Sequence, residues 1–126
     1  MIHVRRAGAL DTRALADLLN AIIAKGGTTA MVTPVTPREL QGWMTAPDSA
    51  WHLAEDERGE IKGFQYIEPH PDLPEGGVDV ATFVRLGETG FGIGSALFDR
   101  TKQAARELGY AHIHANAIPA GIWRWL

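Results

Sequence analysis

The chain of 126 residues contains no cysteine. This absence excludes disulfide bonds, thiolate metal sites and cysteine nucleophiles. An excess of positive charge is also lacking, because the formal net charge is −3, whereas a nucleic-acid-binding domain usually carries a basic patch. No apolar run is long enough to span a membrane, and the polar N-terminal segment does not resemble a signal peptide. We therefore expect no nucleic-acid partner, no membrane partner and a cytoplasmic location.

The remaining composition is typical of a globular domain. Hydrophobic residues make up 45% of the chain and charged residues 21%, which are ordinary proportions for a soluble folded protein. The length predicts one domain over residues 1–126, large enough to bury a core without covalent cross-links.

Hydrophobic spacing predicts a mixed α/β fold of the α+β type, in the order β-α-α-β-β-β-α-β. Three strands in succession before a single helical crossover favour a mixed α/β layer over a regularly alternating doubly wound sheet. We expect Asp11 to cap the first helix, and Thr36 and Glu39 to form a capping box at the second. The predicted elements are strands over residues 2–7, 51–55, 61–67, 78–84 and 110–118, and helices over residues 11–25, 36–44 and 95–108.

A glycine-rich stretch, GETGFGIGSALF, lies between the strand at 78–84 and the following helix. It holds four of the fourteen glycines of the chain. Glycine lets the backbone approach a ligand closely, and the free amides at a helix N-terminus attract anions. This pattern predicts a phosphate-binding loop, although a glycine-rich turn without a ligand is the alternative.

Two common classes of phosphate-binding loop fit this sequence poorly. A nucleoside-triphosphate loop needs a lysine after its last glycine, whereas Gly94 is followed directly by Ser95. A dinucleotide fingerprint needs a third glycine where Ser95 stands, and an acidic residue further on to hold the ribose. No acidic residue occurs from Tyr110 to the last residue.

The segment ATFVRLGETGFGIGSALFDRTKQAARELGY, residues 81–110, resembles motif A of the GNAT superfamily of N-acetyltransferases. Phe83 and Val84 take the strand-end positions of that motif, and residues 89–94 take its loop. Thr89 stands where the family usually has Arg or Gln. Upstream, residues 20–44 and 51–65 resemble the phosphinothricin N-acetyltransferase-like branch, which acetylates amino-acid-type amines.

The resemblance implies a GNAT-like, mixed and mostly antiparallel sheet flanked by helices, shortened at its C-terminal end. It also implies that acetyl-CoA is the acetyl donor. Backbone groups of the strand end would hold the pantetheine arm and polarise the thioester carbonyl, and the loop amides would hold the pyrophosphate. Arg85, Arg100, Lys102 and Arg106 are candidate partners of the 3′-phosphate, with a solvated helix face as the alternative. The residues implied in cofactor binding are Thr82, Phe83, Val84, Thr89, Gly90, Phe91, Gly92, Ile93, Gly94 and Ser95.

An amine must lose a proton before it can attack, and in this branch a carboxylate takes it. The resemblance places that role on Asp79, with a relayed water favoured because aspartate is short; an exposed strand residue is the alternative. Thr28, Thr29 and Trp43 match the substrate-binding region, although turn chemistry and core packing would also explain them.

Two histidines, His112 and His114, are expected to share one face of the last predicted strand. Metal binding needs a third ligand, which no convincing residue supplies, so we expect no metal. His70 and Glu68 are weaker candidates for substrate contact.

The segment HIHANAIPAGIWRWL departs from the family pattern, which continues with a CoA-binding Asn, a helix carrying a Tyr, and a final hairpin. Without gaps the Asn position falls on Gly121, and Tyr110 is the last tyrosine. We expect the last predicted strand to expose an edge. Trp123 and Trp125 would then favour a homodimer, while a truncation or a reading-frame shift are other interpretations.

The sequence therefore predicts an N-acetyltransferase that moves an acetyl group from acetyl-CoA to the primary amine of a small amino-acid-like substrate. The alternative is a non-catalytic acyl-CoA-binding module, or a truncated remnant that a partner subunit completes.

Overall fold

The computed structural model describes residues 2–26, 33–69, 76–88, 92–115 and 122–125, with residues 115 and 122–125 described as backbone. The predicted α/β order is confirmed, and one further strand follows it. The elements are β1 (His3–Arg6), the short 3-10 helix η1 (Ala9–Asp11), α1 (Thr12–Lys25), α2 (Pro37–Met44), β2 (Ala50–Glu55), β3 (Ile61–Glu68), β4 (Gly77–Val84), α3 (Ile93–Glu107), β5 (His112–Ala115) and β6 (Ile122–Trp125).

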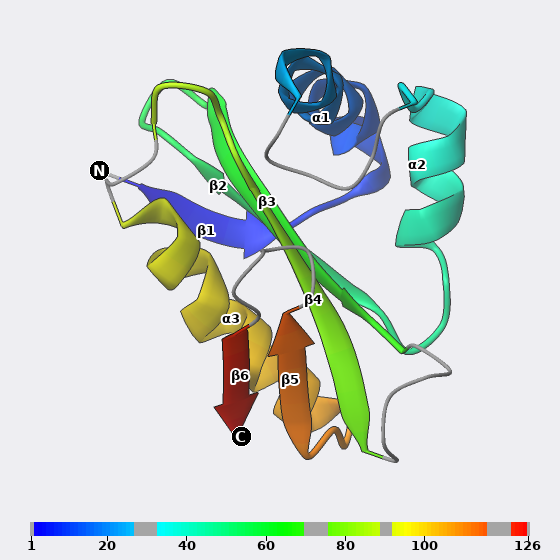
Figure 1. The fold of residues 1–126 in the computed structure, drawn as a ribbon. Helices are drawn as coiled ribbons and strands as arrows, with labels where there is room; N and C mark the ends of the chain where they lie inside the picture. Colours follow the sequence, from blue (N-terminus) through cyan, green and yellow to red (C-terminus); the bar gives the residue numbers. More distant parts are fainter. Residues whose placement is uncertain (1, 27–32, 70–75, 89–91, 116–121, 126) are drawn as a thin grey trace.

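The strands form one sheet in which spatial order follows chain order, from β1 to β6. Every neighbouring pair is antiparallel except β4 and β5, which are parallel and joined by α3. Figure 1 shows α1 and α2 on one side of the sheet and α3 on the other. The predicted mixed, mostly antiparallel sheet is therefore confirmed.

The exposed edge expected at β5 was wrong. β6 lies antiparallel beside β5, in a register that runs from His112 opposite Trp125 to Ala115 opposite Ile122. The sequence IWRW is rich in β-branched and aromatic residues, which favour strands. Pairing through the backbone does not depend on the family pattern, so this segment covers β5 although its sequence departs from that pattern.

The two faces of the sheet carry separate cores. On the α1 and α2 side, Phe64 and Leu53 are fully buried with leucines of both helices. On the α3 side, Val78 and Val80 pack against Ala104 and Ala105. Side chains alternate along β4, so Val78 and Val80 lie on one face and Phe83 on the other.

Aromatic rings stack across three strands on the α1 and α2 side. Trp51 of β2 lies 4.0 Å from Tyr66 of β3 between ring centroids, at an interplanar angle of 9°. Phe64 continues the row to Phe83 of β4 at 5.0 Å. Stacked aromatic pairs stabilise a fold beyond the area they bury, by about 0.5–1.5 kcal/mol each.

The two helix starts differ in how well the sequence predicted them. The hydroxyl oxygen of Thr36 accepts a hydrogen bond from the amide of Glu39, and the carboxylate of Glu39 accepts one from the amide of Thr36. The predicted capping box of α2 is therefore confirmed. Asp11 occupies the predicted N-cap position of α1, but its side chain makes no capping hydrogen bond there. The carboxylate of Asp11 instead accepts hydrogen bonds from the amide of Gly8, at 2.7 Å, and from both terminal nitrogens of Arg5.

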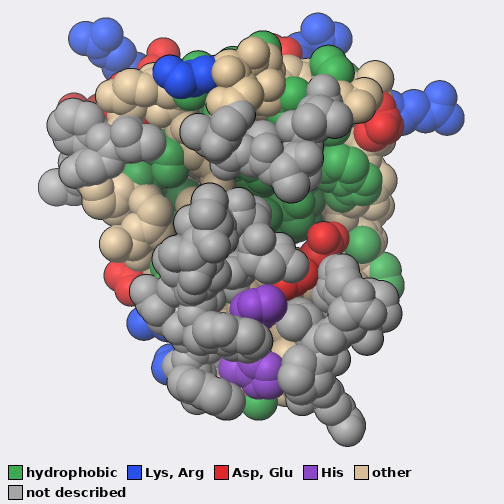
Figure 2. Space-filling view, in the orientation of Figure 1, with side chains coloured by type: hydrophobic (Ala, Val, Ile, Leu, Met, Phe, Trp, Pro, Cys, Tyr) green, Lys and Arg blue, Asp and Glu red, His purple; other side chains and the backbone are tan. Residues whose placement is uncertain are grey.

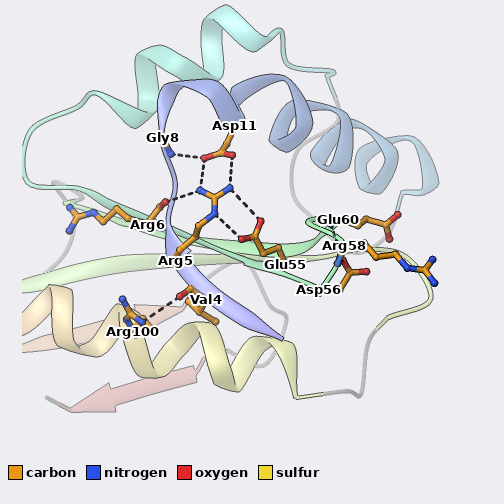
Figure 3. A network of polar contacts seen from close by, with 10 residues as sticks. All are labelled: Val4, Arg5, Arg6, Gly8, Asp11, Glu55, Asp56, Arg58, Glu60 and Arg100. Atoms are coloured by element: carbon orange, nitrogen blue, oxygen red, sulfur yellow. Dashed lines mark hydrogen bonds and ion pairs between the residues drawn. The ribbon is translucent and has the colours of Figure 1, made fainter. Parts of the chain in front are cut away.

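Arg5 connects the start of α1 to the sheet (Figure 3). Its guanidinium donates to Asp11 at 2.8 and 2.9 Å, and its Nε donates to Glu55 of β2 at 3.0 Å. The hydrogen bonds from Arg5 hold the pKa of Asp11 below its ordinary value. A charge-assisted bidentate pair of this kind fixes geometry as well as adding stability.

The sheet and α3 approach each other closely at Gly63. A Cβ atom at this position would lie 2.8 Å from the carbonyl oxygen of Phe83 and 3.1 Å from Cγ2 of Ile93, the first residue of α3. Gly63 therefore allows the N-terminus of α3 to rest directly on β3.

We predict that Gly63→Ala lowers the free energy of unfolding by about 1–3 kcal/mol, because the added methyl group overpacks a backbone contact. Urea unfolding measures the change. Gly42→Ala in α2 is the control, since nothing lies within 4 Å of that position; we expect this variant to gain up to about 1 kcal/mol. A Gly63→Ala protein as stable as the parent would contradict the prediction.

The second stability prediction concerns His52 of β2, which is 4% exposed. Burial, reinforced by the charges of Arg6 and Arg100, lowers its pKa to about 4. The ordinary histidine pKa is about 6.5, so the unfolded chain takes up this proton first as the pH falls. The free energy of unfolding should therefore decrease between pH 6.5 and pH 4, by about 1.4 kcal/mol for each unit of pKa difference.

Denaturant unfolding of the parent and of His52→Gln at pH 7, 5.5 and 4 measures this effect. Other titrating groups act on both proteins, so the difference between the two pH dependences isolates His52. The parent should lose more stability on acidification than the variant. Identical losses would show that His52 protonates equally in the folded and unfolded chains.

Candidate functional site

The strand pairing between β4 and β5 is short. Its register covers Gly77 opposite His112, Val78 opposite Ile113 and Asp79 opposite His114, and it ends there. β4 continues to Val84, so β5 lies beside only the lower part of β4 in Figure 1. Among the described residues, the upper part of β4 has no strand on this side, and its backbone forms an open edge.

Two contacts show which backbone groups face the open edge. The amide of Arg85 donates to the carbonyl of Lys62 at 2.7 Å, toward β3. The carbonyl of Phe83 is also turned toward β3, since it lies 2.8 Å from a Cβ placed on Gly63. Successive residues of a strand direct their backbone groups to opposite sides. Thr82 and Val84 therefore direct theirs to the open edge, which favours them over Phe83 as backbone partners of a ligand.

The N-terminus of α3 lies beside this edge. Gly92 precedes the helix with φ 77°, a left-handed conformation suited to glycine. The amide of Ala96 donates to the carbonyl of Gly92 at 3.0 Å. The amides of residues 93–95 precede this first hydrogen bond of the helix, so no carbonyl of the helix accepts from them. The helix dipole favours an anion at this end. A Cβ on Gly94 would have only Cγ2 of Thr82 within 4 Å, at 3.9 Å.

A buried side chain orients the hydroxyl group of Thr82. Nε2 of Gln65, a residue that is 3% exposed, donates to Oγ1 of Thr82 at 2.7 Å. Because this hydroxyl oxygen accepts from Gln65, its own hydrogen can be donated elsewhere. Thr82 is exposed, so the open edge combines backbone groups with an oriented hydroxyl donor.

Asp79 lies on the opposite face of β4, as its alternation predicted. Its carboxylate is 13% exposed and approaches Nδ1 of His114 to 3.5 Å. Glu68 of β3 stands directly opposite Asp79 in the register. Acidic and histidine side chains lie close together on the face shown in Figure 2. Asp79 therefore occupies the point where β4 and β5 stop pairing, between a carboxylate on one side and an imidazole on the other.

Tyr66 belongs to this group but was not predicted from the sequence. Burial, together with the carboxylates of Glu68 and Asp79, raises the pKa of Tyr66 above its ordinary value. It is 6% exposed and stays a neutral phenol at physiological pH. Tyr66 lies on the same face of β3 as Phe64, and only the pairing of β3 with β4 brings it near Asp79.

Of the other predicted residues, some lie outside the described part of the chain and one packs in the core. Thr28, Thr29 and His70 are outside the described residues, as are the loop residues 89–91. Trp43 is partly buried and packs against the core between α1, α2 and the sheet. In the described parts of the chain, no group of three or more histidine or acidic side chains could hold a metal ion, and no helix is long and apolar enough to cross a membrane.

The cationic candidates for the 3′-phosphate are spread along the surface. Nε of Arg85 donates to a carbonyl of β3 at 2.8 Å, and Arg100 donates to a carbonyl of β1 at 3.4 Å. Lys102 lies 3.8 Å from Asp99. Arg106 is in the last turn of α3, about 20 Å from its start at 1.5 Å per residue. Distance from the loop makes Arg106 the weakest of the four.

Comparison with known proteins adds a fold-level likeness. No model of a known protein family and no curated protein matches the sequence significantly. The structure is similar to a solved protein assigned as a phosphinothricin N-acetyltransferase, with 26% identity, a TM-score of 0.76, and coverage of 91% of this chain and 72% of the other.

Two further solved structures are similar over the same region. A GNAT superfamily phosphinothricin acetyltransferase from Sinorhizobium meliloti, solved with acetyl-CoA, is 23% identical with a TM-score of 0.83, and the match covers 94% of this chain and 67% of that one. An N-acetyltransferase from Staphylococcus aureus is 21% identical with a TM-score of 0.82, over 93% of this chain and 73% of the other. The chain therefore has the GNAT fold, and the similarity to GNAT superfamily acetyltransferases predicted from the sequence is confirmed.

Proposed function

We propose that the protein transfers an acetyl group from acetyl-CoA to the primary amine of a small amino-acid-like substrate. The observation that carries this proposal is the juxtaposition of an open backbone edge at Thr82 and Val84 with the free amides at the start of α3. The same fold is found in the acetyltransferase from S. meliloti that was solved with acetyl-CoA.

The residues present fit this donor. The amides of residues 92–95 suit a pyrophosphate, because no acidic residue stands in the first turn of α3 and the helix dipole favours negative charge. Thr82 and Val84 offer backbone groups to the amides of the pantetheine arm, and a donor aimed at a thioester oxygen stabilises developing charge. Acetyl-CoA supplies an acetyl group activated as a thioester. Thr89, Gly90 and Phe91 complete the loop in this proposal.

Asp79 acts as the general base of the reaction. Its carboxylate is mostly buried yet retains access to solvent, so a water molecule can relay the proton of the amine to it. Tyr66 keeps a neutral hydroxyl on the same face. Thr28, Thr29 and Trp43 are assigned to the amine substrate.

The likeness to proteins named phosphinothricin acetyltransferases supports a small amino-acid-like amine as the acceptor. The homodimeric state and the cytoplasmic location expected from the sequence belong to the same proposal. Light scattering of the purified protein at micromolar concentration measures the state, and a monomer would contradict the dimer.

The proposed pyrophosphate site is tested by adding a negative charge to it. Ser95→Glu places a carboxylate at the exposed start of α3. The helix dipole stabilises this carboxylate, but the carboxylate repels a pyrophosphate. We expect the affinity for CoA to fall at least about tenfold, which corresponds to a loss of about 1.4 kcal/mol. Isothermal titration calorimetry with CoA measures the change.

Gln103→Glu is the matched control for that experiment. It adds the same charge at an exposed position later in the same helix. We expect its affinity for CoA to stay within about twofold of the parent, because surface charges more than a Debye length of about 8 Å away are largely screened. Equal losses in both variants would assign the effect to net charge. Undetectable binding of CoA to the parent protein would refute the proposed function.

The assigned base is tested with Asp79→Asn. Removing a general base typically lowers kcat by about 10²–10⁴-fold, and the affinity for CoA should not change. Release of free thiol in the presence of a panel of amino acids measures turnover. Asp99→Asn, an exposed position on α3 with 77% of its side chain accessible, should leave kcat unchanged. Binding of CoA without any amine-dependent thiol release would favour the alternative, a non-catalytic acyl-CoA-binding module.

A further inference from the structure

His114 contacts Asp79 at the last paired position before β4 and β5 separate. Because the two residues are register partners, their side chains lie on the same face of the sheet. The Nδ1 atom of His114 lies 3.5 Å from Oδ1 of Asp79, and the two side chains are 20% and 13% exposed. A largely buried carboxylate depends strongly on the few polar groups around it.

We propose that His114 is a positioning residue for acetyl transfer, which holds the carboxylate of Asp79 in the orientation that accepts the proton of the amine. This inference rests on the proposed function and adds a residue to its site. In the ligand-free structure the two atoms are in contact without a hydrogen bond. Catalytic contacts of this kind often tighten only in the complex with substrate, and there Nδ1 of the imidazole donates to Oδ1. An imidazole and a carboxylate that orient each other in this way form a recurrent element of acid–base sites.

The neighbouring groups explain why a donor is needed on this side of Asp79. Glu68 stands opposite Asp79 on β3, and two adjacent carboxylates repel each other. Both carboxylates, together with burial, raise the pKa of Tyr66, which lies on the same face. His112, the other histidine of β5, stands opposite Gly77, which has no side chain. Among the described residues, His114 is therefore the β5 side chain placed opposite the proposed base.

The step that His114 supports is balanced without further reactants. The lone pair of the amine nitrogen forms the new C–N bond while the thioester C–S bond breaks. The proton of the nitrogen moves to Asp79, directly or through water, and the departing thiolate takes a proton from solvent. His114 keeps its own proton throughout, since its role is to orient Asp79.

Three substitutions separate a positioning role from simple packing. His114→Leu removes the donor, and we expect kcat to fall about 10- to 100-fold, with the KM for acetyl-CoA and the melting temperature little changed. His114→Asn retains an amide N–H near the position of Nδ1, so we expect kcat within a few fold of the parent. His112→Leu, the same change two residues earlier on the same face, should leave kcat within about twofold. An Asn variant as impaired as the Leu variant would overturn the proposal.

A double-mutant cycle gives the sharper kinetic result. If His114 acts through Asp79, then His114→Leu should change kcat by less than about twofold in an Asp79→Asn background, because the carboxylate it positions is gone. Independent, multiplicative losses would show that His114 acts on the reaction by itself and would overturn the positioning role.

A measurement without turnover distinguishes failure of this inference from failure of the proposed function. In ¹⁵N NMR spectra of the ligand-free protein, the ring signals of His114 should report a proton on Nδ1, and Asp79→Asn should shift them. Asp99→Asn should leave them unchanged, and His114→Asn assigns them. Unchanged His114 signals in Asp79→Asn would overturn the proposed contact. If Asp79→Asn shifts the His114 signals but the parent protein transfers no acetyl group, the proposed function alone is refuted.

Discussion

The short parallel pairing between β4 and β5 is the constraint on which the site depends. The two strands share three residue pairs, and in the part of the chain that the structure describes β4 then continues with its edge open. A parallel pair requires a crossover connection, and here α3 supplies it, so the start of this helix lies beside the open edge. The same geometry leaves Asp79 and His114 together at the last paired position. The backbone edge, the amides proposed to bind an anion and the proposed acid–base pair are therefore consequences of one feature of the sheet.

Close packing of α3 on the sheet sets the precision of that arrangement. Ile93 is 3% exposed and rests over Gly63, where no side chain would fit without displacing backbone. Gly92 turns the chain into the helix with a positive φ. A helix N-terminus binds an anion well only when its amides point at a fixed place, and the Gly63 contact fixes that place relative to Thr82.

The opposite face of the sheet supplies chemistry of a different kind. Stacked rings from Trp51 to Phe83 form a rigid floor beneath α1 and α2, and Arg5 ties the start of α1 to β2 through Asp11 and Glu55. Rigid surroundings favour catalysis because they hold reacting groups in one geometry. Asp79 and Tyr66 lie on the same face of the sheet as these rings.

Local patterns in the sequence determined the elements, the alternation of β4, the capping box at Thr36 and the glycine-rich loop, because each depends on residues a few positions apart. They also carried the likeness to GNAT acetyltransferases. Only the tertiary structure decided that β6 covers β5, that the side chain of Asp11 binds Arg5, and that His114 and Tyr66 stand beside Asp79. These contacts join residues from different strands and helices, and the register between strands, which places them, is set by packing of the whole sheet.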